Sequence, residues 1–379
     1  MARHLEYIGT AKAISYSMVA MSILFWCLGY IFDMAALIHL PTESTIVGLL
    51  IVMMFFMGAF FSTITTSYYS LATIFVANES AMSSIEAAVG SGYILGPILG
   101  SMIYGKMLYR YAYTFISLVM MVTAFVTWKI LAPYLKYKQP EVADGDGLSP
   151  DLEAQTSFGQ QQLVQLPSTI SLLKHRTILF SATTIMWINV AWTCVEPILA
   201  KRLENTFQVG KEGIGVIFSL SNIVYVPTVF LARYLPRRES YTGRHQIISL
   251  SAMLTPIAVL LVGSPTFSLV VMGITLLGLL PTPVWVLLLP FMQIESLRLF
   301  PDPSVKRCVN DLTAGIYNSF MTFGQILGYL IGPLLGSYGF AATTQMVALI
   351  IFLQSLLFHF GTTERFKPRR KKDYIQLMN

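Results

Sequence analysis

The chain has 379 residues, of which 55% are hydrophobic and only 12% charged, and its mean hydropathy is +0.64. About a quarter of the residues of an ordinary soluble protein are charged, so this composition excludes a soluble globular protein. Apolar stretches near the roughly 20 residues that cross a bilayer recur along the whole chain. The composition therefore predicts an all-α, polytopic membrane protein.

Ten candidate membrane spans follow one another along the chain, and one long polar connector interrupts them. The spans are expected at residues 11–32, 45–76, 82–105, 111–135, 177–200, 212–236, 246–264, 267–293, 309–337 and 341–361. The connector contains EVADGDGLSPDLEAQTSFGQQQ, which is typical of a disordered linker. We expect four parts: a bundle of four spans at 1–135, a cytoplasmic linker at 136–176, a six-helix bundle at 177–361 and a basic cytoplasmic tail at 362–379.

The basic residues orient these spans. With a cytoplasmic N-terminus, nineteen of the 25 Lys and Arg residues fall in the N-terminal segment, the linker, two loops and the tail, all on the cytoplasmic side. Five fall in loops on the opposite side, and Lys129 lies within a span. This asymmetry is the positive-inside pattern of membrane proteins. The net charge of +6 therefore reflects the bilayer as a partner, and no nucleic acid is expected.

One decapeptide occurs twice, as GYILGPILGS at Gly92–Ser101 and as GYLIGPLLGS at Gly328–Ser337, with seven identical positions. Each copy places glycines four residues apart, on one helix face, and such a face admits close approach of another helix. Each copy also has a proline, which removes a backbone donor and kinks a helix. The residues are Gly92, Gly96, Pro97 and Gly100, and Gly328, Gly332, Pro333 and Gly336. Either the motif forms a moving, gating contact between bundles, or it is a site of static close packing.

The copies lie in the third and ninth predicted spans. An offset of six spans is typical of transporters built from two six-helix halves related by an axis along the membrane normal. The second copy lies in the fifth span of its half, whereas only two spans precede the first copy. We therefore expect that this chain lacks two N-terminal spans and contains helices 3–12 of a twelve-helix arrangement.

Three stretches carry a resemblance to a known family. The decapeptide resembles an antiporter motif, Gly-xxx-Gly-Pro-xx-Gly, and SSIEAAVGSGYILGPILGSMIYG (Ser83–Gly105) adds an acidic residue, Glu86, before the glycines. CVEPILAKRLENTF (Cys194–Phe207) has an acid-proline pair at Glu196, and GIGVIFSLSNIVYVPTVFLARYL follows it. These stretches resemble the fifth, seventh and eighth helices of vesicular amine and polyamine transporters, in the major facilitator superfamily.

The resemblance implies a two-bundle fold that moves amines into acidic organelles in exchange for protons. The chain departs from the family at one informative position, because the fourth helix of many proton antiporters carries an Arg and Met53 stands there. Two functions from different classes follow. The first is secondary transport of a small organic cation, and the alternative is a transport-inactive, truncated relative that acts as a binding or regulatory partner.

Acidic side chains inside the membrane are the first candidates for binding the substrate or protons, because a charge there costs roughly 3 kcal/mol or more. Glu86 either faces the cavity between the bundles or is an interfacial carboxylate at a helix start. Glu196 either pairs with an ammonium group or lies at the lumenal rim beside Lys201 and Arg202.

Polar residues of two later spans are further candidates. Asn222 and Tyr225 lie in one span, and Tyr317 and Asn318 in another; each either lines a central cavity or makes an interhelical hydrogen bond. Tyr69, with its neighbour Tyr68, is a candidate for cation–π contact with an amine.

No enzyme, cofactor or metal site is expected. The three cysteines form no CxxC pair, the five histidines are dispersed, and no HExxH occurs. The tail ends in Tyr374-Ile375-Gln376-Leu377, which resembles a tyrosine-based sorting signal read by an adaptor protein. A vesicular, endosomal or other endomembrane location is therefore expected in preference to the plasma membrane.

Overall fold

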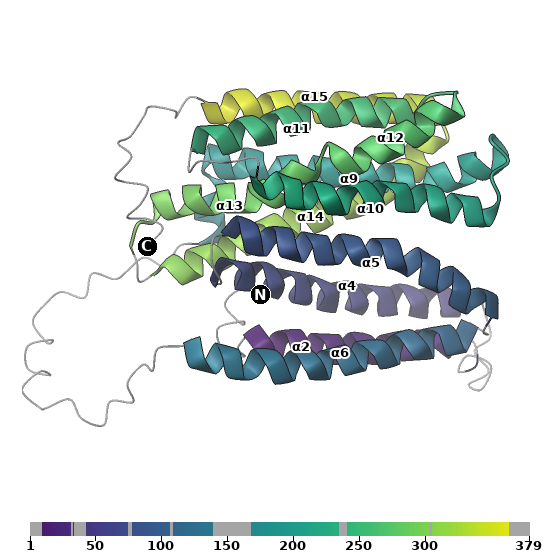
Figure 1. The fold of residues 1–379 in the computed structure, drawn as a ribbon, viewed down its shortest axis with the longest axis horizontal. Helices are drawn as coiled ribbons and strands as arrows, with labels where there is room; N and C mark the ends of the chain where they lie inside the picture. The colour runs from purple at the N-terminus through teal and green to yellow at the C-terminus, as the bar shows by residue number, and fades with distance from the viewer. Residues whose placement is uncertain are drawn as a thin grey trace, which may run out of the picture. The chain divides into compact units, whose positions relative to one another are not determined.

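A computed structural model describes residues 10–31, 33, 43–74, 78–106, 109–138, 168–234, 241–302 and 305–363. These residues are almost wholly helical and contain no β-strand, which confirms the predicted all-α fold (Figure 1). The helices are α2 (Thr10–Gly29), α4 (Glu43–Ile74), α5 (Asn78–Lys106), α6 (Tyr109–Lys138), α8 (Thr169–Leu173), α9 (Arg176–Asn205), α10 (Lys211–Tyr234), α11 (Tyr241–Val262), α12 (Phe267–Leu279), α13 (Thr282–Leu299), α14 (Lys306–Gly336) and α15 (Phe340–Thr363).

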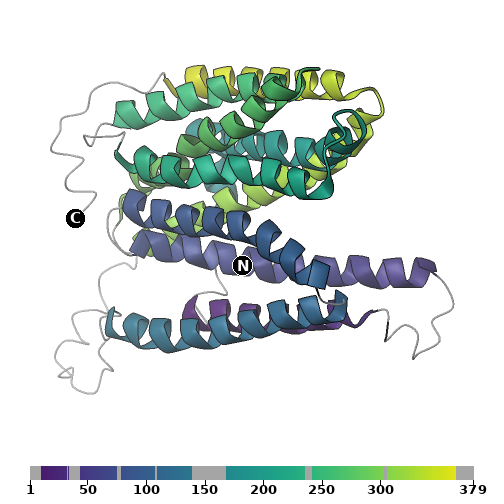
Figure 2. The ribbon, with the colours of Figure 1, turned by 45° about the vertical axis from the view of Figure 1, so that its right-hand side comes forward.

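Nine segments of the described chain are long and apolar enough to cross a membrane, in agreement with a polytopic protein. The segment predicted as a further span at 82–105 forms the 29-residue helix α5. α5 is not among the nine segments. Both views show α5 bending in the half that leads to Lys106 (Figures 1 and 2), the half that contains Pro97.

The span predicted at 267–293 consists of two helices in the structure. α12 ends and α13 begins around Pro281, which cannot donate a backbone hydrogen bond. Side chains satisfy the carbonyls near the break: the Ser251 hydroxyl of α11 donates to the carbonyl of Leu280, and the Thr282 hydroxyl donates to the carbonyl of Gly278 at 2.6 Å. A break inside a membrane requires such partners, because no water is there to supply them.

Contacts between Cα atoms divide the chain into two compact units. Of the described residues, those within 10–64 and 113–138 form the first unit, and those within 65–112 and 168–363 form the second. This division differs from the boundary expected at residue 135, because α5 packs against α10 of the C-terminal part. The four-part division from the sequence stays a prediction about the functional bundles.

The first unit is held together by hydroxyl and ring contacts between α2 and α6. Ser22 donates to the carbonyl of Ser117 at 2.7 Å, and Ser117 donates back to the carbonyl of Ser22 at 2.8 Å. The rings of Tyr16 and Trp128 stack with their centroids 6.1 Å apart. Reciprocal serine bonds of this kind are common between membrane helices, where lipid provides no hydrophobic drive for helix association.

The second unit contains the large apolar core. Its most extensively packed helix pairs are α9 with α14, α11 with α15, α10 with α5, and α9 with α15. Figure 1 shows α11 alongside α15, and the same pair is recognised in Figure 2 by its green and yellow ribbons. Large buried side chains such as Tyr317, Phe291 and Phe358 fill the interior of this unit.

Arg202, near the end of α9, joins three elements of the second unit. Its guanidinium donates to the carbonyls of Val262 at 3.2 Å and Ser264 at 2.6 Å, just after α11. It also lies 4.3 Å from the ring centroid of Phe340 at the start of α15. A planar guanidinium can make both kinds of contact at once, so Arg202 acts as a clamp at this end of the unit.

The predicted linker is helical at both of its ends. α6 continues to Lys138, and the short helix α8 begins after Ser168, whose hydroxyl accepts from the backbone of Ser171 at 3.1 Å. Residues 139–167 lie outside the described residues. Residues 136–138 and 169–173 of the predicted linker are therefore helical, the latter after the cap at Ser168, and the cytoplasmic linker at 136–176 stays a prediction.

Candidate functional site

Glu86 of α5 lies in the interior of the second unit and is only 5% exposed. Tyr225 of α10 donates its hydroxyl to Oε2 of Glu86 at 2.5 Å, and Tyr69 of α4 donates to Oε1 at 3.2 Å. Among the side chains that the structure describes, no Lys or Arg forms an ion pair with this carboxylate. Both oxygens of Glu86 thus accept hydrogen bonds from neutral donors on other helices.

Aromatic rings surround the two tyrosines. The ring of Tyr69 meets that of Tyr317 edge to face, with centroids 5.5 Å apart, and the ring of Tyr225 meets that of Trp285 in the same way at 5.4 Å. Tyr317 also donates its hydroxyl to the backbone carbonyl of Trp285 at 3.0 Å. These four rings, from α4, α10, α13 and α14, form what we call the aromatic cluster around Glu86. Such rings present negative faces that attract organic cations.

Asn318 extends this cluster with amide hydrogen bonds. Its Nδ2 donates to the hydroxyl of Thr66 at 2.8 Å, and its Oδ1 accepts from the hydroxyl of Thr65 at 3.2 Å. Asn318 is 1% exposed, so both ends of the amide are satisfied inside the unit. The structure therefore brings the candidates Glu86, Tyr69, Tyr225, Tyr317 and Asn318 into one region of the second unit.

Glu196 of α9 occupies a different place. It is half-buried, and Tyr329 of α14 donates its hydroxyl to Oε2 of Glu196 at 2.8 Å. No described hydrogen bond joins Glu196 to the aromatic cluster.

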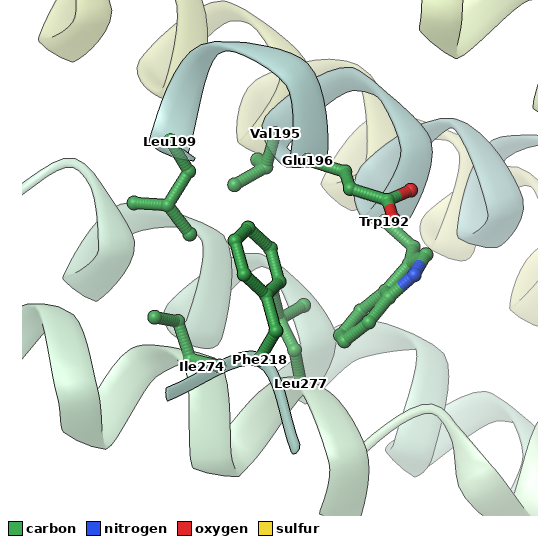
Figure 3. A pocket seen from close by; sticks show the side chains of 7 residues that line it. All are labelled: Trp192, Val195, Glu196, Leu199, Phe218, Ile274 and Leu277. Carbon is green, nitrogen blue, oxygen red and sulfur yellow. The ribbon is translucent and has the colours of Figure 1, made fainter. Parts of the chain in front are cut away.

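A narrow apolar recess adjoins Glu196. Trp192, Val195, Glu196 and Leu199 of α9 line it, together with Phe218 of α10 and Ile274 and Leu277 of α12 (Figure 3). The Phe218 ring points into the recess between α9 and α12 (Figure 3). Glu196 is the one ionisable group among these lining residues. In this conformation the recess has room for about one water molecule, which is too little for an organic substrate.

Asn222 has no described hydrogen bond to the aromatic cluster around Glu86 or to Glu196. Its Nδ2 reaches the carbonyl of Phe218, one turn earlier in α10, at 3.4 Å, and the side chain is half-buried. A role for Asn222 in substrate binding stays a prediction.

The two glycine motifs have different surroundings. Cβ atoms added at Gly328 and Gly332 of α14 would overlap Thr193 and the carbonyl of Cys194 in α9, and one at Gly336 would lie 3.1 Å from Ile198. The second copy is thus a close-packed seam between α14 and α9.

Cβ atoms added at Gly92 and Gly96 of the first copy would meet no described atom within 4 Å. The surroundings of Pro97 and Gly100 lie outside what the structure describes. In the second copy, Pro333 lies inside α14. The gating role predicted for the eight motif residues stays a prediction.

Two contributors to the site were not foreseen from the sequence. Trp285 follows the proline break between α12 and α13, in a segment for which the sequence predicts one uninterrupted span. Tyr329 lies within the second decapeptide, at the position equivalent to Tyr93 in the first copy. Both copies have a tyrosine at this position, and this identity was the signal in the sequence that the residue has a functional role.

Known proteins resemble the chain at two levels. The family model described as "Major Facilitator Superfamily" matches residues 2–294, and no curated protein sequence matches the chain. Among solved structures, the crystal structure of the human organic anion transporter MFSD10 (TETRAN) aligns with a TM-score of 0.56 at 13% sequence identity. The alignment covers 93% of this chain and 81% of that one. A membrane-embedded helical fold, the family match over most of the chain and the aligned transporter agree: the chain belongs to the major facilitator superfamily of membrane transporters.

Proposed function

We propose that the chain is a secondary active transporter of small organic cations, either polyamines or monoamines, which it exchanges for protons by alternating access. Glu86 is the group that binds the ammonium and the proton in turn. The observation that carries this proposal is the setting of Glu86: a buried carboxylate with a tyrosine hydroxyl on each oxygen, inside a cluster of four aromatic rings.

Physical chemistry favours a cation at such a carboxylate. A charged side chain in the membrane interior costs roughly 3 kcal/mol or more, and a bound ammonium or proton removes the net charge. Neighbouring aromatic faces add about 0.5–2 kcal/mol for an organic cation. Because one carboxylate cannot hold both ligands at full strength, binding of one favours release of the other, which is the requirement for exchange.

Glu196 is the second acidic group in this proposal. Its hydrogen bond from Tyr329 leaves the other carboxylate oxygen available to a ligand. A polyamine, which has several ammonium groups, can use both Glu86 and Glu196, whereas a monoamine can use one of them at a time. Separate neutralisation of the two acids therefore distinguishes the two substrate classes.

Transport by the full chain in liposomes with an imposed pH gradient tests the proposal. Uptake of a radiolabelled linear polyamine, an aromatic monoamine and an organic anion is compared for the wild type, Glu86→Gln and Glu86→Asp. Glu204→Gln is the matched control, because Glu204 is an exposed acid near the end of α9. We expect Glu86→Gln to lower amine uptake about tenfold or more, Glu86→Asp to retain part of it, and the control to transport like the wild type.

Three results contradict the proposal. Uptake of the organic anion in place of amines rejects the substrate class, and unchanged amine uptake in Glu86→Gln removes Glu86 from the mechanism. Amine binding without uptake, measured by thermal stabilisation of the wild type, supports the alternative function of a binding or regulatory partner.

We also propose an endomembrane location. The support is the sequence Tyr374-Ile375-Gln376-Leu377, which lies outside the described residues. A fluorescent fusion of the full chain in eukaryotic cells should accumulate in vesicles, and Tyr374→Ala should move it to the cell surface. Vesicular accumulation that is indifferent to Tyr374→Ala argues against an adaptor at this signal.

A further inference from the structure

Gly90 of α5 lies directly against Tyr225 and Val226 of α10. A Cβ added at Gly90 would lie 2.6 Å and 2.8 Å from two ring carbons of Tyr225, Cδ1 and Cε1, and 2.9 Å from Cγ2 of Val226. Real Cβ atoms essentially never come within 3.0 Å of such atoms. The Tyr225 ring therefore occupies the space that any side chain at residue 90 would need.

Gly90 and Glu86 lie on the same face of α5, one turn apart, since residues i and i+4 of a helix are neighbours. The Tyr225 ring lies against Gly90 while its hydroxyl reaches Oε2 of Glu86 at 2.5 Å. One tyrosine from α10 thus spans both positions, and the hydrogen bond depends on the absence of a side chain at residue 90.

The Tyr225 ring has little room to move away. Tyr225 is 6% exposed, and Trp285 packs edge to face against the ring at 5.4 Å and an interplanar angle of 80°. A methyl group at residue 90 must therefore tilt the ring or separate α5 from α10. Either movement lengthens and weakens the hydrogen bond from this hydroxyl to Glu86.

We propose that Gly90 is a positioning residue of the transport site, an inference that rests on the proposed role of Glu86. Gly90 lies outside the repeated decapeptide and contacts no ligand itself. It admits the Tyr225 ring, and Tyr225 in turn holds one oxygen of Glu86 with its hydroxyl. Gly90 thereby sets how strongly Glu86 binds an ammonium group or a proton.

A double-mutant cycle in the liposome assay tests this inference. Gly90→Ala, Tyr225→Phe and the double variant are compared by the KM of the amine and by the pH at which uptake is half-maximal. Gly215→Ala is the control, since Gly215 lies on α10 and an added Cβ there meets nothing within 4 Å among the described atoms.

We expect Gly90→Ala and Tyr225→Phe to change KM by about tenfold, a factor that corresponds to about 1.4 kcal/mol. Both should shift the pH of half-maximal uptake in the same direction and by similar amounts. The double variant should behave like either single variant, because both remove the same hydrogen bond. Gly215→Ala should leave both quantities unchanged.

Two results overturn the inference. The first is a Gly90→Ala effect that adds fully to that of Tyr225→Phe, which indicates a general change of helix spacing. The second is wild-type KM and pH dependence in Gly90→Ala. If Glu86→Gln transports like the wild type, both the proposed role of Glu86 and the positioning role of Gly90 fail. If Glu86→Gln loses transport while Gly90→Ala behaves like the wild type, only the positioning role of Gly90 fails.

A folding rescue covers the case in which Gly90→Ala does not accumulate as folded protein. Tyr225→Leu/Val226→Ala removes both side chains that an added Cβ at residue 90 would meet within 3.0 Å, so Gly90→Ala should then be tolerated. Equal amounts and equal thermal stability of Tyr225→Leu/Val226→Ala with and without Gly90→Ala support the contact through these side chains. A further loss of folding on adding Gly90→Ala contradicts it.

Discussion

The two glycine motifs allow a matched test of how the same sequence behaves in two surroundings. Gly96 and Gly332 hold equivalent positions in the repeated decapeptide. A Cβ at Gly332 overlaps the carbonyl of Cys194 in α9, whereas a Cβ at Gly96 meets nothing within 4 Å among the described atoms. The change to Ala is chemically identical at both positions, so any difference in stability arises from the neighbouring helix.

The size of the difference follows from two opposing effects. Replacing Gly by Ala inside a helix stabilises it by about 1 kcal/mol, and this contribution is common to both positions. Inserting a methyl group into a well-packed contact costs about 1–3 kcal/mol, and this applies to Gly332 alone. The free energy of unfolding should therefore be about 1–3 kcal/mol lower for Gly332→Ala than for Gly96→Ala.

Thermal unfolding of the two variants in the same detergent measures this difference. At roughly 2–4 °C per kcal/mol for chains of 150–250 residues, the midpoints should differ by several degrees, with Gly96→Ala at or above the wild type. Equal midpoints for the two variants would refute the assignment of a packed seam to the second copy and an open face to the first.

Three further predictions concern side chains with defined partners. Arg202→Lys should lower the free energy of unfolding by about 1–3 kcal/mol, because Lys cannot form the same fork of hydrogen bonds; thermal unfolding checks this. Tyr329→Phe should raise the KM for amines several-fold, while Tyr338→Phe, at a ring that is 82% exposed, should not. Asn318→Ala should destabilise the protein by about 1–3 kcal/mol, since it leaves the buried hydroxyl of Thr66 without its donor; an unchanged midpoint would argue against that bond.

The membrane spans were predictable because the bilayer imposes two requirements on every span. Each span must be apolar for about 20 residues and must satisfy its own backbone hydrogen bonds, and both properties are local. The broken span around Pro281 was missed because its composition is as apolar as that of its neighbours. The break is tolerated because Ser251, from another helix, binds the carbonyl of Leu280, and this contact has no local signature.

Glu86 was recognisable as a candidate, since an acid inside a span is rare and costly. Its surroundings were not, because Tyr69 and Tyr225 lie 17 and 139 residues away in sequence. Tyr317 and Asn318 could equally have been separate interhelical contacts. The structure places them in the same region as Glu86 through their contacts with α4, while it gives Glu196 and Asn222 other partners.

The amino-acid sequence by itself determined the helical, membrane-spanning class of this protein, its duplicated motif and the identity of its intramembrane acids. These features follow from composition, hydropathy and spacing, which act over one helix at a time. Only the tertiary structure decided that Gly332 packs against a backbone while Gly96 meets none of the described atoms, and that Gly90 admits the tyrosine that holds Glu86. A glycine or a carboxylate acquires its role from the helix opposite, and helix pairing depends on contacts between residues far apart in the chain.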